Sequence, residues 1–203
     1  MNTIGDIMRL APVIPVLVIE DKADAAPIAR ALVAGGLRVL EVTLRTPAAL
    51  DAIGEMRDVE GAVVGAGTVL NSDQVGQCLA AGAQFIVSPG LTEPVAVAAF
   101  EWGIPFLPGV ATAGDLMRGL DLGLSHFKFF PAETSGGIPA LKALAGPFGG
   151  ARFCPTGGIT QASAPDWLAL DPVLCVGGSW LVPKGPVDPA GIEARARAAA
   201  SLR

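Results

Sequence analysis

Histidine is nearly absent from this sequence, with His126 the only one among 203 residues. A metal site built from several histidines is therefore impossible, and a serine–histidine–aspartate triad would have to use His126. Cysteine is also scarce: Cys78, Cys154 and Cys175 are widely spaced in apolar surroundings and form no zinc-binding pattern. Such cysteines are typical of reduced core thiols. We therefore expect no metal site and a cytoplasmic location.

Charge is equally sparse, at 16% of the residues, and the formal net charge is −5. The basic residues are scattered rather than clustered, which argues against nucleic acid as a partner. The longest charge-poor window, residues 94–114, contains Glu101 and is interrupted by Pro105 and Pro108, so it is a poor transmembrane candidate. The N-terminus carries Asp6 and lacks a basic start followed by an apolar core. We expect neither a signal peptide nor a membrane partner.

Eight apolar, strand-like runs recur at intervals of 20 to 26 residues. They begin near Ile14, Val39, Ala62, Phe85, Pro105, His126, Arg152 and Val173. Segments with helical periodicity separate them, among them residues 23–34, 48–56, 72–81 and 113–122. Eight such units predict a single (β/α)₈ barrel domain over residues 1–203, with a short N-terminal helix and an alanine-rich C-terminal helix over 189–203. An open doubly wound sheet is the alternative, but the dinucleotide-binding Gly-x-Gly-x-x-Gly is missing.

Local signals mark where the predicted helices begin and end. Four glycines stand just before a strand and are expected to end helices in the left-handed conformation: Gly35, Gly82, Gly103 and Gly123. Three threonines are expected to cap helix starts: Thr46 and Thr92, each with a proline close behind, and, more weakly, Thr112.

One of the four lysines, Lys128, is set in an apolar strand, residues 125–130, that ends at Pro131. Strand alternation puts His126, Lys128 and Phe130 on one face. Burial disfavours the ammonium form, and a neutral amine attacks carbonyl carbons to form a Schiff base. The alternative is a structural, ion-paired lysine. We interpret His126 as a filler of the barrel interior rather than a catalyst.

The second strand, predicted over residues 39–45, places Glu41, Thr43 and Arg45 on one face. Chemistry in such barrels lies at the carboxyl ends of the strands, so Glu41 and Arg45 are expected to point into the barrel beside Lys128. Glu41 can shuttle protons during imine formation, and Arg45 suits a substrate carboxylate. A buried salt-bridge network is the alternative.

Two glycine pairs, Gly157-Gly158 and Gly177-Gly178, follow the seventh and eighth strands, where these barrels usually bind phosphate. Bare backbone N–H groups can surround an anion, and Ser179 adds a hydroxyl donor. The alternative is that the glycines serve only turn geometry.

Six motifs resemble the class I 2-keto-3-deoxy-6-phosphogluconate (KDPG) aldolases and the related 4-hydroxy-2-oxoglutarate aldolases. They are EVTLR at 41–45, GAGTVLN at 65–71, SPGL at 88–91, FKFFPAE at 127–133, FCPTGG at 153–158 and GGSW at 177–180. The resemblance implies Lys128 as the Schiff-base lysine and Glu41 as acid and base. It implies a pyruvate end at Arg45, Thr68 and Pro89, a lining of Phe130 and Thr156, and phosphate contacts from Gly157, Gly158, Gly178 and Ser179.

The resemblance further implies cleavage of KDPG to pyruvate and glyceraldehyde 3-phosphate, without a cofactor, by a homo-oligomer that is commonly a trimer. Thr156 favours the gluconate over the galactonate type of substrate. Two alternatives stay open: a phosphosugar isomerase or lyase that uses Lys128 only as a charge, and a non-catalytic protein that binds a phosphorylated metabolite.

Overall fold

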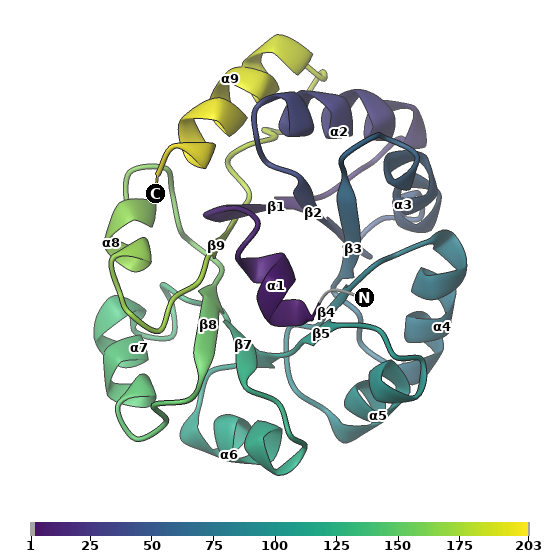
Figure 1. The fold of residues 1–203 in the computed structure, drawn as a ribbon. Helices are drawn as coiled ribbons and strands as arrows, with labels where there is room; N and C mark the ends of the chain where they lie inside the picture. The colour runs from purple at the N-terminus through teal and green to yellow at the C-terminus, as the bar shows by residue number, and fades with distance from the viewer. Residues whose placement is uncertain (1–2, 203) are drawn as a thin grey trace.

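The computed structural model describes residues 3–202, in which strands and helices alternate along the chain (Figure 1). The strands are β1 (Val13–Leu17), β2 (Val39–Thr43), β3 (Val63–Gly67), β4 (Ile86–Val87), β5 (Phe106–Leu107), β6 (Gly109–Val110), β7 (His126–Phe129), β8 (Arg152–Pro155) and β9 (Val176–Gly178). The helices are α1 (Ile4–Met8), the 3-10 turn η1 (Lys22–Asp24), α2 (Ala25–Ala34), α3 (Ala49–Arg57), α4 (Ser72–Ala81), α5 (Glu93–Glu101), α6 (Ala113–Asp121), α7 (Gly137–Ala145), α8 (Ala164–Leu168) and α9 (Pro189–Ala200). The predicted end of the last helix, Arg203, lies outside the described residues.

Every strand pair is parallel, in one sheet of order β5-β4-β3-β2-β1-β9 and a second of order β6-β7-β8. The two sheets meet at Pro108, which alone separates β5 from β6 and has no N–H for a ladder bond. On the other side an isolated bridge joins Thr156 to Gly177. Figure 1 shows the strands curled inside a ring of helices. The predicted α/β class and parallel sheet are confirmed.

Alternating side chains divide the strand residues between an outer and an inner core. Leu40 and Val42 of β2 belong to the outer core, which packs against the helices, whereas Val39 lies in the inner core with Ile7 and Met8 of α1. Glu41 shares the face of Val39, so the strand directs it inward.

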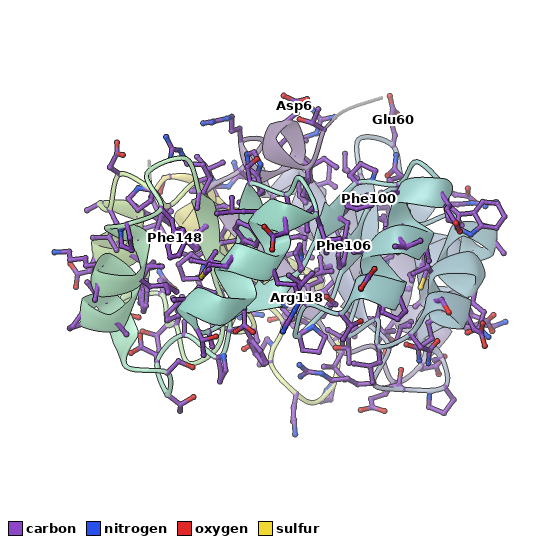
Figure 2. All side chains as sticks on the ribbon, turned by 90° about the horizontal axis from the view of Figure 1, so that it is seen from below. Asp6, Glu60, Phe100, Phe106, Arg118 and Phe148 are labelled. Atoms are coloured by element: carbon purple, nitrogen blue, oxygen red, sulfur yellow. The ribbon has the colours of Figure 1, made fainter. Side chains whose placement is uncertain are left out.

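Helix α1 closes the inner core at the end where the strands begin. A Cβ added to Gly5 would lie 2.6 Å from Nε2 of His126, so the helix backbone rests directly on this half-buried ring. Asp6 of α1 and Glu60, in the loop before β3, lie at this same end of the molecule (Figure 2). Helix α1 thus covers the amino ends of the strands rather than their carboxyl ends, where the site is expected.

Two helix ends lack the predicted cap, although Gly35 does stand at the C-cap of α2. Thr46 does not cap α3, which begins at Ala49; its hydroxyl instead donates to the carbonyl of Ile19 in another loop. Gly35 is right-handed (φ −77°), and the left-handed residue is Gly36 (φ +93°). A Cβ on Gly35 would collide with α9, which explains the glycine by close approach rather than by φ.

The remaining predicted helix ends agree better with the structure. Gly82, Gly103 and Gly123 are left-handed, as predicted. Thr112 forms a full capping box with Asp115, whereas Thr92 stands at the N-cap of α5 without a capping hydrogen bond from its side chain. Among residues 3–202, no helix combines the length and hydropathy needed to cross a membrane.

Candidate active site

Two buried charged side chains meet near the carboxyl ends of β2 and β7. Nζ of Lys128 donates a hydrogen bond to Oε1 of Glu41 over 2.9 Å, and the exposed fractions of the two side chains are only 6% and 4%. Phe127 and Phe129, on either side of the lysine, face the outer core. Burying an ion pair removes two charges from water, and apolar packing would stabilise the interior at least as well. The pair is therefore a candidate for chemistry rather than for stability.

The end of β3 shapes the space around Glu41. A Cβ on Gly67 would lie 2.7 Å from Cγ of Glu41, so no side chain fits at this position. Thr68 follows with φ +60°, the one positive φ at a non-glycine residue among those described. This conformation costs of order 1–3 kcal/mol and persists where the surroundings impose it, often at functional sites. Thr68 is half-buried at the mouth of the strands.

Pro89 lies beside the strand of the lysine. A Cβ on Gly109 would collide with the carbonyl of Pro89, and Gly109 is the register partner of Lys128. The hydroxyl of the buried Ser88 donates to the carbonyl of Gly90, which closes the turn that presents Pro89.

Phe130 and Thr156 directly follow β7 and β8. The centroid of the Phe130 ring lies 5.4 Å from Nζ of Lys128, and the peptide bond that follows Phe130 is cis. Thr156 is buried and packs on Gly177, where a Cβ would lie 2.7 Å from Cγ2 of the threonine.

Arg45 departs from the prediction. Strand β2 ends at Thr43, and the backbone N–H of Arg45 donates to the carbonyl of Thr43 in a tight turn. Strand alternation no longer applies beyond that turn, and Arg45 is exposed at the rim rather than directed into the interior.

The two glycine pairs are brought together at one edge of the site. Gly157 (φ +105°) and Gly158 (φ +82°) both need the freedom of glycine, and Gly177 of the second pair is bridged to Thr156. Ser179 follows β9 and lines a cavity of about 520 Å³. The cavity also reaches Val16, the register partner of Glu41. A cavity of about 580 Å³ between α3 and α4 contains none of the predicted site residues.

Sequence reasoning missed that three glycines make room for neighbouring groups of the site: Gly67, Gly109 and Gly177. The available signal was a glycine inside a strand, which marks close approach of another group. Glu133, the last residue of the motif at 127–133, follows β7, and its carboxylate accepts a hydrogen bond from the indole of Trp167 over 3.0 Å.

Neither metal ligation nor a reactive thiol is favoured elsewhere in the described chain. No group of three or more histidine, cysteine, aspartate or glutamate side chains within residues 3–202 could hold a metal ion. All three cysteines are buried, and burial raises the pKa of Cys78 to about 12, which keeps its thiol protonated and poorly nucleophilic.

Known proteins are similar to this chain in both sequence and fold. The family described as "KDPG and KHG aldolase" matches residues 4–194. The chain is 61% identical over 203 residues to a 2-dehydro-3-deoxy-phosphogluconate aldolase of Zymomonas mobilis, covering 100% of this chain and 98% of the relative. A crystal structure of the Z. mobilis aldolase with 3-phosphoglycerate superposes with a TM-score of 0.97 at 61% identity, covering 98% of this chain and 96% of that one.

A second crystal structure bears on the chemistry. The KDPG aldolase of Legionella pneumophila, with pyruvate captured as a covalent carbinolamine intermediate, superposes with a TM-score of 0.95 at 45% identity. The match covers 98% of this chain and 99% of that one. The chain described here belongs to the KDPG and KHG aldolase family.

Proposed function

We propose that the chain is a Schiff-base aldolase that cleaves KDPG to pyruvate and glyceraldehyde 3-phosphate and also acts on 4-hydroxy-2-oxoglutarate. The observation that carries the proposal is the buried hydrogen bond between Lys128 and Glu41, because it sets a potential nucleophile against a proton acceptor. Family membership and the carbinolamine captured in the L. pneumophila relative support it.

The reaction begins when Glu41 takes a proton from Lys128 and the neutral amine attacks the 2-keto carbon. A proton returned by Glu41 to the new hydroxyl lets water leave the carbinolamine, which gives an iminium. Glu41, a carboxylate again once the water has left, accepts the C4 hydroxyl proton, which it later returns to C3. The C4 oxygen becomes the aldehyde carbonyl, the C3–C4 bond breaks, and its bonding electrons pass into the iminium to form an enamine. Glyceraldehyde 3-phosphate leaves, C3 of the enamine is protonated, and hydrolysis releases pyruvate and regenerates the lysine.

The two ends of the substrate contact different groups in this proposal. Arg45, Thr68 and Pro89 surround the pyruvate end, and Arg45 reaches over from the rim to bind the carboxylate. Phe130 and Thr156 line the middle, and Thr156 favours the gluconate configuration. The proximity of Pro89 and Phe130 to Lys128 supports this orientation.

The phosphate binds at the opposite end of the substrate. Gly157, Gly158 and Gly178 offer backbone N–H groups and Ser179 offers its hydroxyl. The positive φ of the first pair, the bridge between Thr156 and Gly177, and the phosphorylated ligand in the Z. mobilis structure support the site.

We further propose that the two sheets form one closed (β/α)₈ barrel and that the chain is a single domain. Two observations support closure: Pro108 alone separates β5 from β6, and Thr156 bridges to Gly177 at the other junction. One hydrophobic core draws residues from Ala11 to Ala199, so no break in the core marks a second domain among the described residues.

The protein is proposed to act as a cytoplasmic homotrimer without metal or cofactor. Helices α5 and α6 each leave an apolar pair uncovered, Val97 with Phe100 and Met117 with Leu120, with exposed fractions of 39% to 58%. Such a surface suits a second copy of the chain. Sedimentation equilibrium should give three times the monomer mass, and charges at Val97 and Met117 should give monomers.

Turnover tests the function directly. The wild-type protein should release equal amounts of pyruvate and aldehyde from both substrates. In the Lys128→Arg variant the positive charge remains but the guanidinium cannot form an imine, so turnover should be lost. Partial activity in that variant would favour the isomerase or lyase alternative, and a wild type that binds phosphorylated substrates without cleaving them would favour a binding protein.

A further inference from the structure

Glu133 connects three elements that meet beside the glycine turn after β8. Its backbone N–H donates to the carbonyl of Gly157 over 3.1 Å, and the preceding Ala132 donates to the carbonyl of Thr156 over 2.8 Å. Its carboxylate accepts the 3.0 Å hydrogen bond from Nε1 of Trp167, which lies on α8 and is 1% exposed. These hydrogen bonds connect the segment that follows β7, the strand of Lys128, to the turn after β8 and to α8.

The methylene stem of Glu133 lies directly on the turn. A Cβ added to Gly158 would lie 2.6 Å from Cγ and 2.7 Å from Cβ of Glu133. Gly158 is left-handed, so both its φ and this contact exclude a larger residue. A change in the rotamer of Glu133 therefore alters the packing contact between its Cγ and Gly158.

The indole bond is what fixes that rotamer. An exposed glutamate loses side-chain entropy when it is held in one conformation, and a hydrogen bond from a rigid, buried donor opposes that loss. Trp167 is rigid because its ring is enclosed in the outer core, with its centroid 6.3 Å from that of Phe129. Phe129 is the residue next to Lys128, so the same ring also abuts the lysine strand.

We propose that Glu133 is a positioning residue for phosphate recognition, held by Trp167 so that its stem and backbone N–H fix the Gly157–Gly158 turn. The inference rests on the proposed phosphate role of this turn. It assigns no proton transfer to Glu133. Lys128 and Glu41 retain the chemistry, and Glu133 governs how well the phosphorylated end of the substrate binds.

Variants at the two partners, with both substrates, test the proposal. Trp167→Phe keeps an aromatic ring but removes the donor, and Glu133→Ala removes the acceptor and the stem. Each should raise KM for KDPG about tenfold, the typical effect of losing one hydrogen bond to a charged group, with kcat changed by less than about twofold. KM for 4-hydroxy-2-oxoglutarate, which has no phosphate, should stay within about twofold of wild type. The double variant should be no worse than the more impaired single variant, because both remove one interaction.

Controls separate positioning from loss of structure and from charge. Trp102→Phe makes the same substitution at an exposed tryptophan at the end of α5 and should change neither KM. Glu133→Gln keeps an acceptor oxygen for the indole, although a neutral one, and should have a KM for KDPG between those of wild type and Glu133→Ala. Borohydride trapping of pyruvate in each variant reports whether the lysine end is intact.

Equal increases in KM for both substrates would overturn the proposal, as would unchanged KM values in both single variants or a Glu133→Gln variant as impaired as Glu133→Ala. Failure of the underlying function would appear in the wild type instead, as an absence of pyruvate release or of any preference for the phosphorylated substrate.

Discussion

The substitution Gly67→Ala should disable the active site by adding a single methyl group. That methyl would lie 2.7 Å from Cγ and 2.8 Å from Cδ of Glu41, whereas carbon atoms in contact are about 3.5–4.0 Å apart. The carboxylate must therefore retreat by about 1 Å. Glu41 is almost fully buried, so this movement lengthens its 2.9 Å hydrogen bond with Lys128.

A displacement of about 1 Å in a catalytic group lowers the rate about 10²-fold, which corresponds to roughly 2.7 kcal/mol in the barrier. We expect kcat for pyruvate release from KDPG to fall by about this factor, while the protein stays folded by circular dichroism at 25 °C. Because the chemistry at Lys128 is common to both substrates, 4-hydroxy-2-oxoglutarate should suffer equally.

Two matched glycine variants serve as controls. Gly65→Ala, on the same strand, would place its methyl within the van der Waals envelope of the Phe85 ring, 2.5 Å from Cδ2 and Cε1, and should lower the melting temperature more than kcat. Gly76→Ala, on α4, meets nothing within 4 Å and should preserve kcat while stabilising the fold by about 0.4–1 kcal/mol. A folded Gly67→Ala variant with kcat within about twofold of wild type would refute the reasoning.

Three further outcomes are expected. Ser179→Asp should raise KM sharply for KDPG, since the new carboxylate would face the substrate phosphate, but should raise KM little for 4-hydroxy-2-oxoglutarate. Equal increases in KM for both substrates would indicate that the glycine pairs serve only turn geometry. Chelators should leave turnover intact, because one histidine and scattered cysteines cannot build a catalytic metal site; activity lost in EDTA and restored by a divalent ion would contradict this. Burial, with Arg9 and Arg152 nearby, lowers the pKa of His126 below its ordinary 6.5 despite the opposing charge of Asp6. His126 therefore binds a proton more readily in the unfolded chain, so the free energy of unfolding should fall as pH drops below about 6.5. The free energy of unfolding of His126→Gln should fall less over the same pH range. Identical pH dependence in the two proteins would contradict this explanation.

Local signals predicted the fold where they also decided the structure. Helix α4 has the predicted bounds because Asn71 caps its start and the left-handed Gly82 ends it, both within a few residues of the helix. Strand alternation likewise accounts for the inward direction of Glu41. These features depend on backbone periodicity and capping chemistry, which a sequence displays directly.

The errors arose where a distant segment competed for the same residue. Thr46 has the sequence context of an N-cap, but its hydroxyl donates a hydrogen bond to the carbonyl of Ile19, 27 residues away. Gly35 was explained by φ, whereas the approach of α9 from the far end of the chain requires it. Arg45 was placed by extending an alternation past Thr43, where β2 ends.

The candidate site likewise combines features that the local sequence displays with contacts that form only between distant residues in the folded chain. Lys128 stood out because its strand is otherwise apolar, yet its bond to Glu41 spans 87 residues and appears only in the folded chain. A glycine inside a strand at residue 67 indicates the close approach of another group, but that this group is Glu41 appears only in the folded chain. The Glu133–Trp167 bond, 34 residues apart, had no sequence signal that we could identify.

The central claim, a Schiff base at Lys128, is tested most directly by reduction with borohydride in the presence of pyruvate, read by peptide mass spectrometry. The account predicts a reduced pyruvate adduct on the peptide that contains residue 128, no adduct in Lys128→Arg, and slow but detectable trapping in Glu41→Gln, where the acid and base is lost but the amine remains. An adduct on Lys22, Lys142 or Lys184 instead, or no adduct in a protein that turns over KDPG, would contradict it.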